Sequence, residues 1–205
     1  MDNNAVALKE WAIAIRALSE GRQILLLRKG GIAEETREFQ LESPSFYLYP
    51  TYEHQREELL KPDYRPALAA VLAGWKPKEQ TVEIDYRAVV EADLEISSRD
   101  ELDRLRELHI WTDSFAEERL RWKRTKPLHA LLLRVYRLEE PLRLPILPQY
   151  GGCKSWIRLD AESHSERDSV PVLSEEEFSS AVGTVRQALN GGPAVVKTFL
   201  SESGR

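Results

Sequence analysis

The sequence has little cysteine and no long apolar run. Its one cysteine, Cys153, excludes an internal disulfide and is typical of a protein from a reducing compartment. No stretch approaches the roughly 18 consecutive apolar residues that a membrane-spanning helix needs. The N-terminus lacks the basic flank and the apolar run of a signal peptide. We therefore expect a cytoplasmic protein that does not enter a membrane.

Several motifs of nucleotide and metal chemistry are also missing. The sequence contains no GxxxxGK[ST], GxGxxG, GxSxG or HExxH. Its four histidines lie far apart and show no metal-ligand spacing. No lysine follows an Asp or Glu by two positions, so the [DE]xK signature of a common metal-dependent nuclease fold is absent. The sequence thus predicts no metal site and identifies no cofactor.

The composition is that of a globular chain of moderate size. Hydrophobic residues make up 42% of the 205 residues, and the net charge of -5 makes the protein acidic overall. Any nucleic-acid binding must therefore come from a local basic patch. We expect one domain over 1–160, followed by a polar linker and a C-terminal helix within 161–205.

Hydrophobic periodicity predicts strands mixed with unequal helices. Helices are expected at 4–20, 51–60, 66–72, 98–108, 114–123 and 175–190, and strands at 23–29, 38–42, 46–50, 81–96, 129–138 and 154–159. Ser98, with Glu101 three positions later, predicts a capping box. LLLRKGGI and FYLYP are expected to be neighbouring strands. This order predicts an α+β fold with a small mixed or antiparallel sheet and flanking helices.

A basic strand end at Arg28, Lys29, Gly30 and Gly31 is the first candidate site. Two glycines let backbone N–H groups converge on an anion, and the two cations add charge. A tight turn flanked by solvated charges explains the same residues.

The end of the 46–50 strand is the second candidate. Tyr49 and Tyr52 offer ring faces for stacking, and Glu53 with His54 offers a carboxylate and an imidazole for proton transfer. The alternative is the start of a helix capped by Thr51 with ordinary surface residues.

The stretch 119–138 is the third candidate, because it carries seven basic residues and no acid. Basic residues interleaved with aromatic ones suit phosphates and stacked bases. The alternative is a solvated face whose charges pair with the acids of 91–107. The expected ligand contacts are Arg119, Arg121, Trp122, Lys123, Arg124 and Lys126.

The segment YGGCKSW (150–156) is the fourth candidate. Lys154 beside Cys153 can lower the pKa of the thiol, whereas a turn into a strand with Cys153 as a small buried residue explains the pattern equally.

Six segments together carry a family resemblance: ALKEWA, LLLRKGGI, YPTYEHQ, HIWTD, PLHALLLRVYRL and YGGCKSWI. In them the chain resembles the bacterial family of domain of unknown function 1802 over roughly residues 5–160. That resemblance implies that the segments belong to one unit, and it implies no activity. The layout of long strands is also similar to partly closed β-barrels of the pseudouridine-synthase type, many of which bind RNA or modified bases.

Three functions remain open from the sequence. The first is a module that binds nucleic acid or a nucleotide-like, phosphate-bearing ligand. The second is a hydrolase of a phosphorylated or nucleotide substrate, with Arg28 and Lys29 on the anion and Glu53 or His54 moving a proton. The third is a protein-interaction module, which a large exposed apolar patch would mark.

Overall fold

The computed structural model describes residues 5–29, 41–76, 79–121, 127–152, 154–159 and 168–190, and the backbone of 196–197. The strands are β1 (Val6–Trp11), β2 (Leu25–Arg28), β3 (Ser45–Thr51), β4 (Thr81–Ile96), β5 (Leu128–Pro145), β6 (Trp156–Arg158), β7 (Ser169–Pro171) and β8 (Val196–Lys197). The α-helices are α1 (Ala12–Ser19), α2 (Arg65–Ala73), α3 (Arg99–Arg104), α4 (Asp113–Arg121) and α5 (Glu175–Leu189). No described helix is long and apolar enough to cross a membrane.

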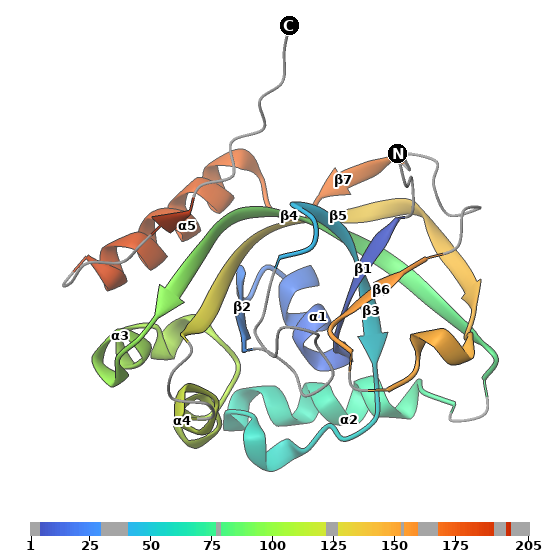
Figure 1. Cartoon of the computed structure of the whole chain (residues 1–205), viewed down its shortest axis with the longest axis horizontal. Coiled ribbons are helices and arrows are strands. Elements are labelled where there is room, and N and C mark those ends of the chain that lie inside the picture. Colours follow the sequence, from blue (N-terminus) through green and yellow to red (C-terminus); the bar gives the residue numbers. More distant parts are fainter. Residues whose placement is uncertain are drawn as a thin grey trace, which may run out of the picture.

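Two long strands, β4 and β5, form the spine of the sheet. They pair antiparallel from Thr81 opposite Pro145 to Ile96 opposite Leu128, with register shifts between Ile84 and Tyr86 and between Val90 and Ala92. Such irregularities increase the local twist and bend of a sheet. In Figure 1 the two strands arch over α1.

The remaining strands extend the sheet to both sides of this spine. The order is β2-β5-β4-β3-β1-β6, with β7 on β5 and β8 on β4. β1 runs parallel to β3, and the other pairs are antiparallel. The expected α+β fold with a mixed sheet and flanking helices is therefore confirmed. Among the described strands, β2 and β6 end the path without pairing to each other, so the sheet is not a closed barrel.

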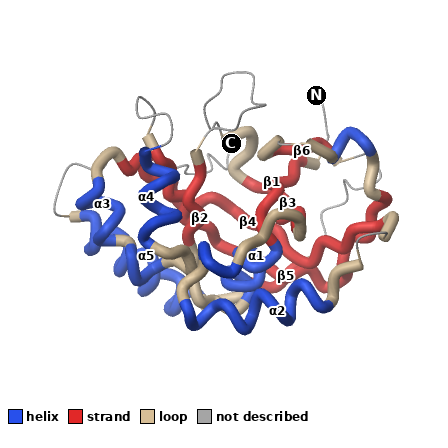
Figure 2. Tube along the Cα trace, turned by 90° about the horizontal axis from the view of Figure 1, so that it is seen from below, coloured by secondary structure: helices blue, strands red, loops and turns tan. Residues whose placement is uncertain are grey.

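The main core lies between the curved sheet and its helices. From α1 it takes Ile13, Ala14 and Leu18, and these pack with the apolar runs of β2 and β5. Figure 2 shows α3, α4 and α5 at one end of the sheet. The predicted C-terminal helix is confirmed as α5, and it buries four side chains in this same core: Phe178, Val182, Val185 and Leu189.

Several sequence predictions are confirmed. The 46–50, 81–96, 129–138 and 154–159 strands correspond to β3, β4, β5 and β6. The 66–72 and 114–123 helices correspond to α2 and α4. The capping box is formed, because the Ser98 hydroxyl accepts from the Glu101 N–H while the Glu101 carboxylate accepts from the Ser98 N–H. Most of the strand expected at 38–42 lies outside the described residues.

The helix expected at 4–20 is wrong in its first half. Residues Val6–Trp11 form β1, and α1 begins only at Ala12. Leu8 and Trp11 do fit a helical stripe, but β1 lies between β3 and β6, and these two ladders take its backbone hydrogen bonds. Tertiary pairing thus overrides local periodicity.

Two further expectations are wrong. The segment 51–60 is not an α-helix: a turn at His54, with φ of 62°, is followed by a short 3-10 turn over Glu57–Leu59. LLLRKGGI and FYLYP lie in one sheet but are not neighbours, because β5 and β4 lie between β2 and β3.

One buried histidine makes the stability of the fold depend on pH. His109 is 2% exposed, and its Nδ1 accepts the Trp111 N–H at 3.2 Å, which requires that nitrogen to be unprotonated. Burial, together with the nearby charge of Lys61, lowers the pKa of His109 from 6.5 to about 4. The unfolded chain takes up this proton at a higher pH than the folded protein does.

We predict that this group removes stability as the pH falls from 6.5 to 4 and contributes no pH dependence above that window. The full pKa difference corresponds to about 3 kcal/mol. Urea denaturation at pH 7 and pH 4.5 measures the loss, and His109→Asn, whose side-chain oxygen can accept from the same N–H, should show a smaller one. An equal loss in both proteins would contradict the prediction.

Candidate ligand pocket

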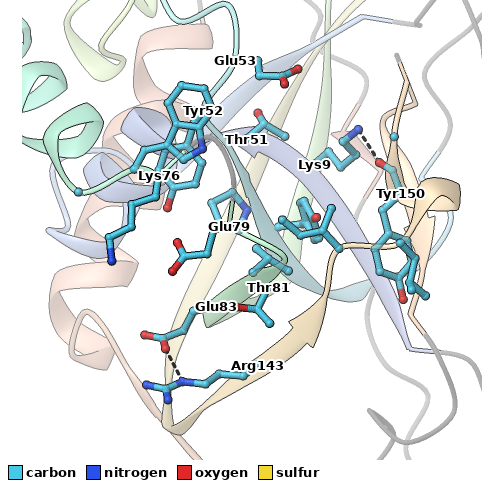
Figure 3. A pocket seen from close by; sticks show the side chains of 18 of the residues that line it. Lys9, Thr51, Tyr52, Glu53, Lys76, Glu79, Thr81, Glu83, Arg143 and Tyr150 are labelled. Carbon is cyan, nitrogen blue, oxygen red and sulfur yellow. Dashed lines mark hydrogen bonds and ion pairs between the residues drawn. The ribbon is translucent and has the colours of Figure 1, made fainter.

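A pocket of about 860 Å³ opens at the end of the sheet where β4 begins and β5 ends (Figure 3). Its walls come from the end of β3 with residues 52–53, the segment after α2, the start of β4, and residues 143–151. In Figure 3, Lys9 lies beside Tyr150 on one side, and Lys76, Glu79, Glu83 and Arg143 lie on the other. The pocket joins segments that are far apart in the sequence and has the size of a small-molecule site.

Aromatic rings form the apolar part of the wall. Tyr52 and Trp75 are stacked with centroids 5.8 Å apart and planes 6° apart. Tyr49 and Tyr150 meet edge to face at 6.0 Å. Gly74 ends α2, and the Trp75 N–H donates to the carbonyl of Leu72, which sets the indole just beyond the helix.

Hydrogen bonds from Lys9 hold one side of the pocket wall in place. The side chain projects from β1, and its Nζ donates to the carbonyl oxygens of Tyr150 and Gly152, each at 2.8 Å. Gly152 has φ of 77°, a backbone conformation that favours glycine. The backbone N–H of Lys9 also donates to the carbonyl of Ser155. Tyr150, Gly152 and Ser155 are thereby held against β1.

The polar lining contains three cations and three carboxylates. Arg143 bonds Glu83 at 2.6 Å, but both side chains are exposed, so this ion pair stabilises little by itself. Among the residues that the structure describes, the side chains of Lys76, Glu53 and Glu79 make no hydrogen bond or ion pair. These three groups are therefore available to a ligand.

Acidic groups dominate the field around Tyr52. Burial raises the pKa of Tyr52, and so do the charges of Asp85, Glu79 and Glu83. Asp85 lies where the β4–β5 register shifts, and burial and Glu83 raise its pKa while Arg143 opposes them. The Tyr52 hydroxyl therefore stays protonated and can donate a hydrogen bond.

Three of the predicted site residues line this pocket: Tyr49, Tyr52 and Glu53. Gly151 of the YGGCKSW segment lines it too, so the second and fourth candidate sites meet in space. His54 follows Glu53, is exposed and is not part of the wall. Cys153 lies outside the described residues.

The basic pair Arg28 and Lys29 lies elsewhere. Arg28 Nη1 bonds Glu10 Oε2 at 3.0 Å, and both side chains are nearly buried. Lys29 is 3% exposed and donates from Nζ to the carbonyl of Leu120 in α4, and burial lowers its pKa. Gly30 and Gly31 lie outside the described residues.

The described part of the basic stretch meets this pair. Arg119 packs over the Phe115 ring at 4.9 Å, and burial and then the nearby Arg28 lower its pKa while Glu10 opposes them. Arg121 forms an ion pair with Glu117 rather than with the acids of 91–107. The rest of the predicted contacts in this stretch lie outside the described residues: Trp122, Lys123, Arg124 and Lys126.

The curved sheet brings Arg28 of the basic pair close to the pocket across β1. Arg28 Nη1 donates to the carbonyl oxygen of Lys9 at 3.4 Å, and Lys9 lines the pocket. The carbonyl oxygen of Glu10, the ion-pair partner of Arg28, accepts from the hydroxyl of Thr51, which also lines the pocket. Arg28, Lys29 and Arg119 are not themselves part of the pocket wall.

Sequence reasoning missed most of the polar wall. The missed charged and aromatic residues are Lys9, Trp75, Lys76, Glu79, Glu83 and Arg143. The one available signal was a tryptophan directly after the helix-ending Gly74, since a large aromatic residue in a polar connection has no core of its own to fill. Within the described residues, no three His, Cys, Asp or Glu side chains gather where they could hold a metal ion.

The chain belongs to the family described as domain of unknown function (DUF1802), whose model matches residues 7–183. The match extends past residue 160 into α5. Among solved structures, the chain is similar to an ASCH protein from Zymomonas mobilis, at 13% identity and a TM-score of 0.44. A single-residue mutant of the ASCH protein from that organism gives 12% identity and a TM-score of 0.45. In both cases 89% of this chain and 96% of the other are covered. A search of curated proteins returned no match.

We predict that Lys9→Met destabilises the protein by about 1–3 kcal/mol, because two carbonyls lose a charged donor. Denaturant unfolding measures the change. Lys154→Met is the matched control, since Lys154 is exposed and makes no contact that the substitution would remove. Equal stability of the two variants would show that the Lys9 contacts contribute nothing measurable.

Proposed function

We propose that this domain is a binding module for a nucleotide-like ligand, whose base enters the pocket and stacks against the Tyr52–Trp75 pair. The observation that carries the proposal is the joining of an open aromatic pair with unpartnered polar side chains in one pocket. Base-to-aromatic stacking contributes about 1–3 kcal/mol per base. Glu53 and Glu79 can accept from ring N–H and amino groups, and Lys76 can meet a phosphate.

The lining of the pocket favours this function over an extended nucleic-acid groove. Arg28, Lys29 and Arg119 are engaged in interior contacts and do not line the pocket. Arg121 is paired with Glu117 of α4. A single nucleotide, or one exposed base of a longer strand, is what the pocket can hold.

The other two functions have less support. The hydrolase hypothesis places Arg28 and Lys29 on the anion and Glu53 or His54 at the proton, and of these residues only Glu53 lines the pocket. A protein-interaction module would present a large apolar patch. Among the described residues, Ile146 and Val170 are the exposed large hydrophobic side chains, and Ile146 belongs to the pocket wall.

Titration calorimetry with the four nucleoside monophosphates tests the proposal. We expect at least one to bind, and Trp75→Ala to weaken that binding by about 5- to 150-fold, which corresponds to the loss of one stacked base. Trp75→Phe keeps a ring face and should retain most of the affinity.

Tyr136→Ala is the control, because Tyr136 is an aromatic residue of the sheet outside the pocket, under the guanidinium of Arg87. An unchanged affinity in Trp75→Ala, or no binding of any nucleotide, contradicts the proposal. Release of phosphate during the titration would instead identify the protein as a hydrolase.

A further inference from the structure

We propose that the pocket selects a planar heteroaromatic ring that carries a positive charge, such as an N-alkylated base, over the neutral parent ring. This inference rests on the proposed function, because it names the class of ligand that the same pocket takes. Two features carry it: the way the charges of the wall are compensated, and the place of the acids relative to the aromatic pair.

The cations of the wall are mostly committed to protein partners. Lys9 directs two of its three N–H donors at carbonyl oxygens, and Arg143 bonds Glu83. Of the lining cations that the structure describes, Lys76 is then the one whose side chain makes no hydrogen bond or ion pair. The carboxylates of Glu53 and Glu79, which also line the pocket, likewise make no hydrogen bond or ion pair with a described residue. Among the described residues that line the pocket, the charge left without a hydrogen-bond or ion-pair partner is therefore negative.

The acids also lie on the side of the aromatic pair. Asp85, Glu79 and Glu83 all act on the Tyr52 hydroxyl in the same direction, and each raises its pKa. A ring stacked on Tyr52 and Trp75 lies in that field. The faces of Tyr and Trp rings are themselves negative and attract a cation by about 0.5–2 kcal/mol. A charged planar ring gains from both sources, whereas a neutral ring gains from stacking alone.

Asp85, two residues after the lining Glu83 on β4, strengthens the preference. It is half-buried at the register shift of the spine, with its pKa raised first by burial and then by Glu83. A cation nearby would relieve that destabilised charge, and a phosphate would add to it. The base end of the pocket is thus built for a cation, so any phosphate of the ligand must point away from it, toward Lys76 or solvent.

Binding of 1-methyladenosine, a cation at pH 7, and of neutral adenosine tests the inference. We expect the cation to bind about 10-fold more tightly at low salt, and the ratio to shrink as ionic strength rises. Glu79→Gln should lower the ratio several-fold, and Lys76→Met should raise it. Glu176→Gln is the matched control, since Glu176 is an exposed residue of α5 and makes no described side-chain contact.

The outcomes separate the two proposals. Equal binding of both nucleosides, or tighter binding of adenosine, overturns the charge selectivity and leaves the proposed function standing. Binding of neither nucleoside, nor of any nucleotide, overturns both. Spermidine, an aliphatic cation, should bind more weakly than 1-methyladenosine, and an equal affinity would overturn the requirement for a ring.

Discussion

The pairing of β4 with β5 is the constraint on which the rest of the structure depends. The two strands hold each other in register from Thr81 and Pro145 to Ile96 and Leu128, and every other described strand pairs directly or through neighbours with this ladder. Since the ladder is bent at two register shifts, the sheet curves around α1 and buries it. The same ladder places the pocket at the end where β4 begins and β5 ends.

This arrangement separates two kinds of charge. In the interior, Arg28 and Glu10 are paired and nearly buried, and Lys29 is bound to a backbone carbonyl of α4. Removing one partner of such a pair leaves an uncompensated buried charge, which is strongly destabilising, so these contacts serve the fold. At the pocket end, Glu53, Glu79 and Lys76 are exposed and make no such contacts, so they can be desolvated by a ligand instead.

Local sequence patterns correctly predicted the elements whose hydrogen bonds are made by residues close together in the sequence. Ser98 and Glu101 form the capping box that their spacing requires, and α2 ends at Ala73, one residue past the helix expected at 66–72. The helix predicted over Val6–Trp11 was wrong, because these residues fit a helical stripe and only their pairing with the neighbouring strands makes them β1. Pattern alone cannot choose between two periods when the deciding hydrogen bonds come from residues far away in the sequence.

The same reason limited prediction of the site. Tyr49, Tyr52 and Glu53 were found because they cluster within a few residues at a strand end. Trp75, Glu79 and Arg143 were not found, because Trp75 and Glu79 come from the connection between α2 and β4 and Arg143 comes from β5. Only the folded sheet brings these residues to one wall with β3. The convergence of Arg28 and Lys29 with Arg119 likewise depends on β2 and α4 meeting across about 90 residues of chain.

The location of the ligand is the central claim, and the indole N–H resonances of the five tryptophans test it most directly. In a two-dimensional nitrogen–proton spectrum, titration with the tightest-binding nucleotide should shift the Trp75 resonance. Those of Trp11, Trp111 and Trp156, whose rings pack in the core, should stay in place. Assignment follows from Trp75→Phe and Trp122→Phe. A shift of the Trp122 resonance with no change at Trp75 would place the ligand at the basic stretch and contradict the account.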